Sequence, residues 1–295
     1  MKSVALIIFG YNRPNHLKKT INKLQKNKEF GILTKYIFID GPKNYKDKIK
    51  INSIKKFLKK KKFKNCFFSK KNKGLANSII DGINYVSGKF ESFIIVEDDL
   101  IVSKNFLTFM INCLNKFEYS KEIFSICGYC YPLANRNILE DDIFISKRFC
   151  SWGWATWRNK WKKINFKVFE KKKIFEKKEI QNLDKNIGED FQSLINAKIK
   201  SEIDSWAVIF SYNQFLKKAY SVYPKFSMVK NIGHDNSGTH SKKVNKWNTT
   251  LDEKFLPSKF PKKLYFNNNI HQEMLLNFKK NKIKNLFKKI LIFKN

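Results

Sequence analysis

Three consecutive acidic residues, Glu97-Asp98-Asp99, come directly after the apolar run Phe93-Ile-Ile-Val96. Such a run predicts a buried strand, so three carboxylates are gathered where that strand ends. Like charges held this close repel one another strongly unless a cation is present. A hard divalent ion, Mn2+ or Mg2+, binds carboxylate oxygens and also neutralises a diphosphate leaving group. The triplet therefore predicts a divalent-metal site with Asp99 as the direct ligand.

The orientation of these side chains follows from strand geometry. Side chains alternate along an extended chain, which points Glu97 and Asp99 to one side and Asp98 to the other. A role for Asp98 in the same site must therefore come from the turn after the strand. The alternative interpretation of the triplet is an ordinary acidic surface loop.

Two other polar clusters follow apolar runs in the first third of the chain. Asn12-Arg13-Pro14 comes after Val4–Phe9, and the Arg13 guanidinium suits a phosphate or a base carbonyl. Asp40-Gly41-Pro42 comes after Tyr36–Ile39, and the Asp40 carboxylate suits a base NH. The alternatives are a helix-initiating loop with Pro14 in the first turn and a plain Asp-Gly turn.

The second half of the chain carries further candidates. Asp204-Ser205-Trp206 holds an isolated carboxylate, and the segment 232–240 is rich in Gly, Ser and His. The latter composition suits a mobile loop whose backbone NH groups wrap a diphosphate. His234 and Ser237 are donor-side candidates there. For His234, metal binding, a phosphate contact and loop packing all stay open.

A cluster of tryptophans lies between residues 152 and 161. Large aromatic rings most often fill a core, but sugar rings also stack on aromatic faces. Trp152 or Trp154 is therefore a candidate floor for an acceptor site.

Short apolar runs alternate with amphipathic stretches through the first third, which predicts strand, helix, strand and so on. This alternation indicates an α/β fold with a mainly parallel sheet wrapped by helices. In such folds ligands bind beyond the carboxyl ends of the strands, where all three polar clusters fall. From about Glu118 the alternation gives way to irregular, aromatic-rich sequence. We therefore expect a nucleotide-binding half at 1–117, an acceptor half at 118–250 and a basic tail at 251–295.

The composition is strongly basic, with 60 Lys and Arg against 25 Asp and Glu and a formal charge of +35. Such a charge attracts polyanions or an anionic membrane, although AT-rich codon usage is an alternative source of lysine. The odd set of five cysteines suits a reducing cytoplasm, and Cys127-x-x-Cys130 is best interpreted as buried thiols. No run approaches the roughly 20 apolar residues that span a bilayer.

Residues 278–295 combine many lysines with apolar residues on one helical face, namely Ile283, Leu286, Ile290 and Phe293. This pattern favours a basic amphipathic helix at the inner face of the cell membrane, with about 1 kcal/mol for each lysine near the surface. The alternative is a solvated terminal helix packed on the body.

Taken as an ordered set, four motifs resemble those of bacterial sugar transferases of surface-polysaccharide loci, which look similar to the N-acetylglucosaminyltransferase I family. The motifs are Val96-Glu-Asp-Asp-Leu100, Ser151-Trp-Gly-Trp154, Ile203-Asp-Ser-Trp206 and Asn231-Ile-Gly-His-Asp-Asn-Ser-Gly-Thr-His240. The resemblance covers roughly residues 1–245. It implies a GT-A fold, a manganese ion and inverting transfer.

The resemblance also implies roles for single residues. Arg13 and Asp40 would contact the uracil or ribose side of a UDP-sugar, with Glu97 beside them, Asp98 would hold the ribose and Asp99 the metal. Gly153 and Trp154 would belong to the acceptor side, and Asp204 would be the catalytic base. The loop before the acidic strand contains Lys73-Gly74, without the aromatic residue or His expected for base stacking.

These features predict an enzyme that moves a hexose or N-acetylhexosamine from a UDP-sugar to a lipopolysaccharide, capsule or lipid-linked glycan. One alternative is a nucleotidyl- or phosphosugar transferase on the same fold. Another is a nucleic-acid-binding protein, but no binding motif supports it and the lysines are spread along the chain, so we expect no nucleic-acid partner.

Overall fold

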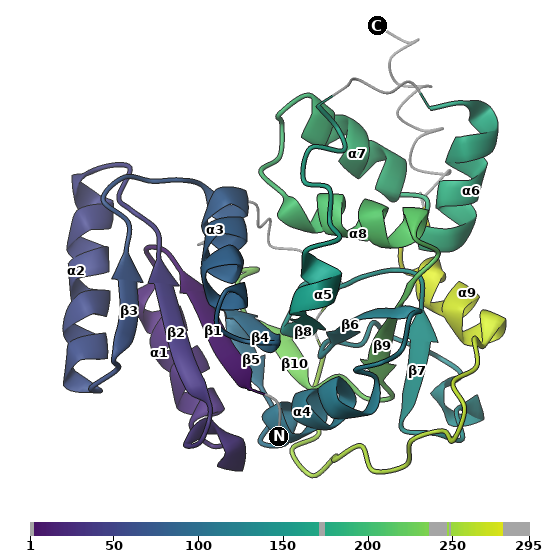
Figure 1. Cartoon of the computed structure of the whole chain (residues 1–295), viewed down its shortest axis with the longest axis horizontal. Coiled ribbons are helices and arrows are strands. Elements are labelled where there is room, and N and C mark those ends of the chain that lie inside the picture. The colour runs from purple at the N-terminus through teal and green to yellow at the C-terminus, as the bar shows by residue number, and fades with distance from the viewer. Residues whose placement is uncertain (1–2, 171–174, 236–246, 248, 280–295) are drawn as a thin grey trace, which may run out of the picture.

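The computed structural model describes residues 3–170, 175–235, 247 and 249–279 of the 295-residue chain. Within these ranges the centre is an eight-stranded sheet with the order β3-β2-β1-β4-β8-β6-β9-β7 (Figure 1). Its strands are β1 Val4–Gly10, β2 Thr34–Ile39, β3 Asn65–Phe68, β4 Ser92–Glu97, β6 Ile123–Cys127, β7 Ile143–Ser146, β8 Trp154–Trp157 and β9 Tyr220–Pro224. The first four strands are parallel, whereas β8 and β7 run antiparallel to their neighbours.

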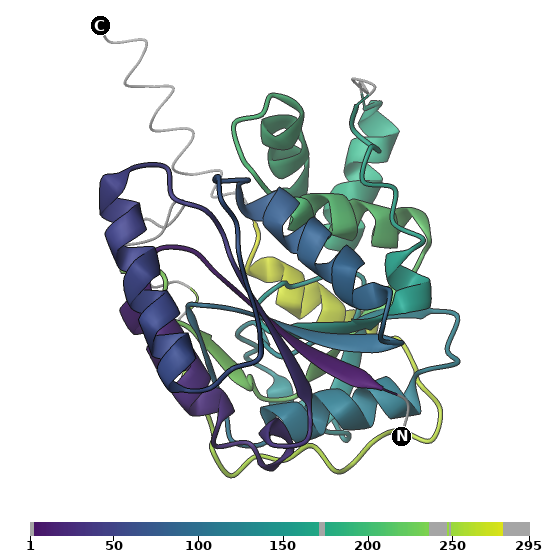
Figure 2. The same cartoon turned by 60° about the vertical axis from the view of Figure 1, so that its left-hand side comes forward.

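Helices cover both faces of this sheet. Helices α1 and α2 lie on one face of the parallel strands, and α3 lies on the other (Figure 2). The helices are α1 Pro14–Leu24, α2 Tyr45–Lys60, α3 Leu75–Ser87, α4 Phe106–Lys116, α5 Arg158–Trp161, α6 Lys177–Ile187, α7 Phe191–Ile199, α8 Trp206–Leu216 and α9 Asn268–Leu276. The expected α/β architecture with a mainly parallel sheet is confirmed.

The topology places a crevice between β1 and β4. From β1 the chain winds outward through β2 to β3 and then returns to the other side of β1 to form β4. The strand order therefore reverses at β1, and such a switch point opens a ligand crevice at the carboxyl ends. Phe9 pairs with Glu97 and Gly10 with Ile39, so the residues after β1, β2 and β4 emerge at one level.

A small antiparallel ribbon closes one side of this crevice. Strand β5, Leu100–Val102, pairs with β10, Val229–Asn231. Because β5 starts directly after Asp99, this pairing brings residues 231–235 next to the acidic triplet. Two segments that lie more than 120 residues apart in the sequence thus meet at the carboxyl end of β4.

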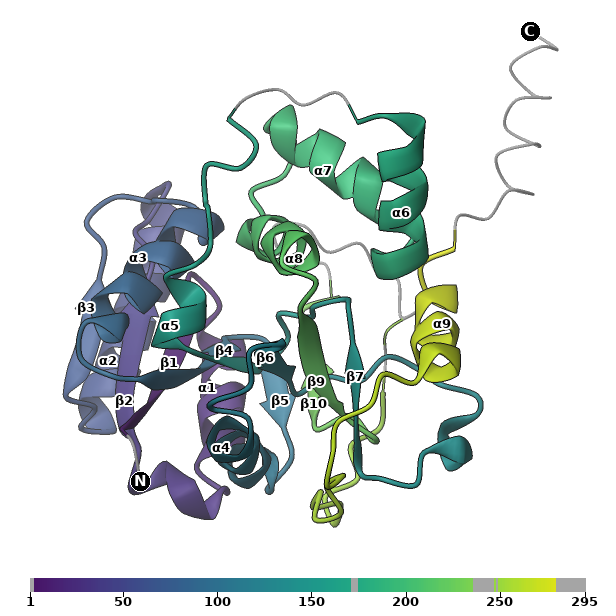
Figure 3. The same ribbon diagram turned by 45° about the vertical axis from the view of Figure 1, so that its right-hand side comes forward.

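The predicted division at residue 117 falls within a continuous sheet. Strand β4 from the first part pairs with β8 from the second, and one buried core extends from Val4 to Phe278. A second, smaller core holds α6, α7 and α8 together above the sheet, as Figure 3 shows. The two boundaries between the three expected segments stay predictions.

Part of the predicted tail packs on the body. Ile270 and Met274 of α9 are fully buried, and Glu253 forms an ion pair with Lys23 at 2.8 Å. The amphipathic pattern of residues 278–295 lies almost entirely outside the described residues.

Among the helices of the described ranges, none has the length and apolar character that crossing a bilayer requires. Cys127 and Cys130 are buried free thiols, as expected.

The buried side chain of Asn27 joins two segments that are remote in sequence. Its amide donates to the Ser103 carbonyl at 3.0 Å, and its oxygen accepts from the Leu107 NH at 2.8 Å. We expect Asn27→Ala to lower the free energy of unfolding by about 2–3 kcal/mol, because these backbone groups lose buried partners. Urea unfolding measures the change, and the exposed Asn196→Ala in α7 should stay within about 0.5 kcal/mol of the parent protein. Equal effects of the two substitutions would contradict this role of Asn27.

Candidate functional site

A cavity of about 460 Å³ opens where β1, β2 and β4 end. Its wall includes segments from both halves of the chain, because the loop before α3, the first turn of α3 and the loops after α7 and β10 also reach it. The predicted site residues that line it are Arg13, Asp40, Glu97, Asp98, Asp99, Trp152, Asp204 and His234. The three polar clusters that the sequence placed in one crevice therefore meet in one cavity, and Trp152, Asp204 and His234 line the same cavity.

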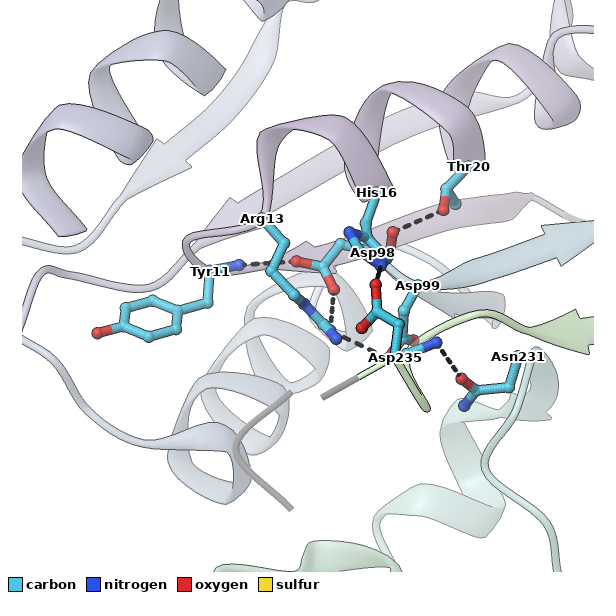
Figure 4. A network of polar contacts seen from close by, with 9 residues as sticks. Tyr11, Arg13, His16, Thr20, Asp98, Asp99, Asn231 and Asp235 are labelled. Atoms are coloured by element: carbon cyan, nitrogen blue, oxygen red, sulfur yellow. Dashed lines mark hydrogen bonds and ion pairs between the residues drawn. The ribbon is translucent and has the colours of Figure 1, made fainter. Parts of the chain in front are cut away.

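The acidic triplet faces the guanidinium of Arg13. Its Nη2 forms an ion pair with Asp98 and a second one with Asp99 at 3.0 Å (Figure 4). The other oxygen of the Asp98 carboxylate accepts from the Tyr11 NH at 3.2 Å, and the Thr20 hydroxyl donates to the Asp98 carbonyl at 2.7 Å. One guanidinium against three carboxylates leaves net negative charge, which favours an additional cation.

The expected alternation of these side chains does not extend past the strand. Strand β4 ends at Glu97, and Asp98 and Asp99 form a turn that brings both carboxylates to the Arg13 guanidinium. Period-two alternation applies only to extended backbone, so Asp98 reaches the same guanidinium as Asp99 through the turn, as the sequence argument required. The turn supplies the role for Asp98 that the strand alone would not.

Burial and mutual repulsion shift the titration of this cluster. Burial raises the pKa of Glu97 to about 8, and the neighbouring charges of Asp99 and Asp98 add to the shift. Burial likewise raises the pKa of Asp98 to about 6, although the Arg13 guanidinium opposes it. A further positive charge here would stabilise both ionised carboxylates.

The segment after β10 lies directly over Asp99. The Ile232 NH donates to the Asp99 carbonyl at 2.9 Å, and the Asn231 side chain accepts from the Gly233 NH at 2.7 Å. A Cβ on Gly233 would stand 2.1 Å from the Asp99 carboxylate, so only glycine allows this approach. Asp235 pairs with His16 of α1 at 3.1 Å, which fastens the segment on its far side (Figure 4).

His234 lies in the cavity wall with its ring against Trp152, at a centroid distance of 5.5 Å. Its buried Nε2 has no hydrogen-bond partner among the described residues. A buried ring nitrogen without a partner suits a metal ion or a phosphate oxygen. The three alternatives for His234, namely metal binding, a phosphate contact and loop packing, therefore all stay open.

The side chains near Asp99 fit a divalent ion whose remaining ligands come from a substrate. The described residues contain no ready group of three or more His, Cys, Asp or Glu side chains around one point. Ions of the Mg2+ type need no such cage, since they are held by one or two carboxylates together with substrate phosphates. Asp99, with His234 beside it, meets that requirement.

Asp40 is engaged with the loop between β3 and α3. One oxygen accepts from the Gly41 and Lys73 NH groups at 2.8 and 2.9 Å. The other accepts from the Asn72 amide at 3.0 Å and from the Gly74 NH at 3.1 Å. The structure therefore places Asp40 in the cavity wall as the organiser of this loop, and its contact with a base stays a prediction.

Asp204 lies across the cavity at the first turn of α3. Its Oδ2 accepts from the Ala76 NH at 3.2 Å, and Lys198 Nζ lies 4.0 Å from Oδ1. The local sequence explains its place, because the Ser205 hydroxyl caps α8 and Trp206, 2% exposed, anchors that helix in the core. Asp204 is thereby held just before the start of α8, and its side chain is 41% exposed.

The predicted acceptor residues separate into two groups. Trp152 lines the cavity, but the Trp154 side chain is fully buried and stacks on Trp206 at 5.0 Å. Gly153 is also enclosed, since a Cβ there would stand 2.9 Å from Val229. The expected direct contact of Gly153 and Trp154 with an acceptor is therefore wrong, because both residues pack in the core. Core packing was the alternative interpretation of the tryptophans. Ser237 and His240 lie outside the described residues.

One residue that supports the cavity wall, Asp47, was not identified from the sequence. Asp47 of α2 is 6% exposed and accepts from the Tyr11 hydroxyl and the Asn12 amide, both at 2.6 Å. It also accepts from the Lys43 NH at 3.1 Å, so it ties the loops after β1 and β2 together. A single aspartate near a helix start carries no sequence signal beyond capping, and only the fold reveals these partners.

Several solved structures resemble the chain at low identity. They are the mannosyltransferase PcManGT from Pyrobaculum calidifontis in complex with GDP-Man and Mn2+ (10% identity, TM-score 0.39, 54% of this chain and 45% of that one), GalNAc-T7 with UDP, GalNAc and Mn2+ (11%, 0.49, 78% and 43%) and S. aureus TarS 1-349 (12%, 0.43, 75% and 60%). The chain thus spans between 43% and 60% of the length of these chains. No curated protein matches it.

A family profile gives the more direct assignment. The profile described as Glycosyl transferase family 2 matches residues 5–187, which is more than half of the 295 residues. The match runs from β1 to the end of α6 and so includes the acidic triplet, Arg13 and Asp40. The chain therefore belongs to glycosyl transferase family 2.

Proposed function

We propose that this protein transfers a hexose or N-acetylhexosamine from a UDP-sugar to a cell-surface glycan acceptor, with inversion and with Mn2+ or Mg2+. The observation that carries the proposal is the shared cavity. It holds the acidic cluster around Arg13 on one side and the Asp204 carboxylate on the other. A charge-neutralising side and a proton-accepting side are the two parts that such a transfer requires.

The donor side would be built on the loops after β1, β2 and β4. Asp99, with His234, would hold the divalent ion, which when bound supplies positive charge to the diphosphate leaving group. Arg13 holds Asp98 and Asp99 together and offers its guanidinium to the same wall. Asp40 fixes the loop that forms the opposite edge and is our candidate for the base contact, while Ser237 is a further donor-side candidate.

The acceptor side would be built on Asp204 and Trp152. In a single displacement the acceptor oxygen bonds to the sugar carbon as the bond to the diphosphate breaks on the opposite face. The Asp204 carboxylate takes the acceptor hydroxyl proton during this step. Its 41% exposure leaves it open to an acceptor, and Trp152 offers an aromatic face in the same cavity.

The charge of the chain supports the proposed acceptor class. A formal charge of +35 and the lysine-rich residues 278–295 favour an anionic surface, so we place the enzyme at the cytoplasmic face of the cell membrane. A lipid-linked glycan or a lipopolysaccharide core would present its hydroxyl groups there. Family membership favours this glycosyl transfer over nucleotidyl transfer on the same fold.

The class of donor can be tested directly. Purified protein is incubated with UDP-, GDP-, CMP- and dTDP-sugars, with Mn2+ or with chelator, and nucleotide release is measured. We expect Mn2+-dependent release of UDP from one donor. Release of pyrophosphate or a nucleoside monophosphate would instead identify nucleotidyl or phosphosugar transfer, and silence with all donors together with no nucleotide-induced thermal shift would contradict the donor site.

The metal assignment predicts a strong effect of Asp99→Asn. Loss of one carboxylate weakens the hold on the ion, so we expect turnover to fall by roughly 100-fold or more and the Mn2+ requirement to rise. The matched control is Asp81→Asn, because Asp81 is an exposed residue on α3, 57% accessible. A Mn2+ titration of activity compares the variants, and an unchanged Mn2+ requirement in Asp99→Asn would refute the ligand role.

The base assignment predicts a different pattern for Asp204→Asn. Turnover should fall by roughly 100- to 10,000-fold, the usual contribution of a positioned base, while binding of the UDP-sugar stays nearly unchanged. Initial rates and calorimetric donor binding separate the two quantities. Glu170→Gln, at an exposed carboxylate, should behave like the parent enzyme. Unimpaired turnover of Asp204→Asn would remove Asp204 from the mechanism.

A further inference from the structure

The loop that connects β3 to α3 is clamped to the end of β2. Asp40 accepts hydrogen bonds from Asn72, Lys73 and Gly74, and the Asn72 amide also donates to the Gly41 carbonyl at 3.0 Å. A Cβ on Gly41 would stand 2.3 Å from the Lys71 carbonyl carbon. The loop backbone therefore lies against β2 at a distance that only glycine permits at position 41.

The other end of the same loop touches Asp204. Gly74 has φ +81° and ψ 164°, a conformation that is essentially restricted to glycine. A Cβ on Gly74 would stand 2.5 Å from the Asp204 Oδ2 atom. That same oxygen accepts from the Ala76 NH at 3.2 Å in the first turn of α3. Gly74 therefore makes room for the carboxylate and also directs the chain into the helix that binds it.

We propose that Gly74 is a positioning residue for Asp204, and that the turn Asn72–Gly74 links the donor-side Asp40 to the base. The inference rests on the proposed function, in which Asp204 accepts the acceptor proton. Between the Asp40 carboxylate and the Asp204 carboxylate there are only the Gly74 NH, one peptide segment and the Ala76 NH. The geometry of Asp40 thus sets the position of the base.

Competing contacts at Asp204 are weak. Lys198 lies 4.0 Å away, at the outer limit of an ion pair, and the carboxylate is 41% exposed. The hydrogen bond from Ala76 is thus the close contact that orients Oδ2. A shift of the α3 start would leave the base free to rotate, which reduces turnover without removing any group that contacts the donor.

The test compares Gly74→Ala with Gly88→Ala. The two glycines stand at opposite ends of α3, and Gly88 has φ −68° with no atom closer than 3.5 Å to an added Cβ. We expect Gly74→Ala to lower kcat by roughly 10- to 100-fold, the range for loss of one charged hydrogen bond that orients a reacting group. The KM for the UDP-sugar should change by less than about threefold. Gly88→Ala should match the parent enzyme in both constants.

A double substitution tests whether the effect passes through Asp204. If it does, Gly74→Ala combined with Asp204→Asn is no slower than Asp204→Asn alone, because the positioned group is already lost. Multiplying effects would overturn the inference and leave the base assignment intact. Full activity of Asp204→Asn would overturn both, so the two failures are distinguishable.

Asn72→Ala gives an independent variant in case Gly74→Ala does not fold. It removes the side-chain bonds to Asp40 and Gly41 without imposing a strained backbone. We expect the same pattern with a smaller loss of kcat, about 5- to 10-fold, and again no additional loss in the Asp204→Asn background. An effect on the donor KM alone would assign the turn to donor binding and overturn the inference.

Discussion

The charge balance at the end of β4 is the constraint around which the rest of the structure is arranged. Three carboxylates lie at the end of one buried strand, and the Arg13 guanidinium from the loop after β1 pairs with two of them. Helix α1 contributes to this balance from the other side, since Thr20 binds the backbone of Asp98 and His16 pairs with Asp235. Positions in α1, β4 and the segment after β10 are thus linked through one small polar cluster (Figure 4).

This cluster can exist only because the topology reverses between β1 and β4. If successive strands simply added at one edge, the loops after β1 and β4 would lie several strands apart, and Arg13 would not reach Asp98. With β4 next to β1, the two loops start from paired residues and their side chains meet without long connections.

Most of the fold could be predicted from the sequence, but only part of the site could. Apolar runs such as Val4–Phe9 and Phe93–Val96 identify buried strands, and the polar residues after them fall at the correct edge. Strand alternation did not apply to Asp98, because a turn begins there. For Trp154, composition alone did not distinguish a core indole from an exposed one. Asp47 and Gly74 depend on partners that are brought close only by tertiary structure, so no local pattern reveals them.

The continuous sheet has a consequence for how the enzyme can move. Many two-part enzymes close over their substrates by rotating one rigid part against the other. Here the β4–β8 ladder joins the strand that carries the acidic triplet to the strand that follows Trp152. A hinge rotation between the two walls would break these hydrogen bonds. The β4–β8 ladder therefore opposes closure of the cavity by rotation of one half of the sheet against the other.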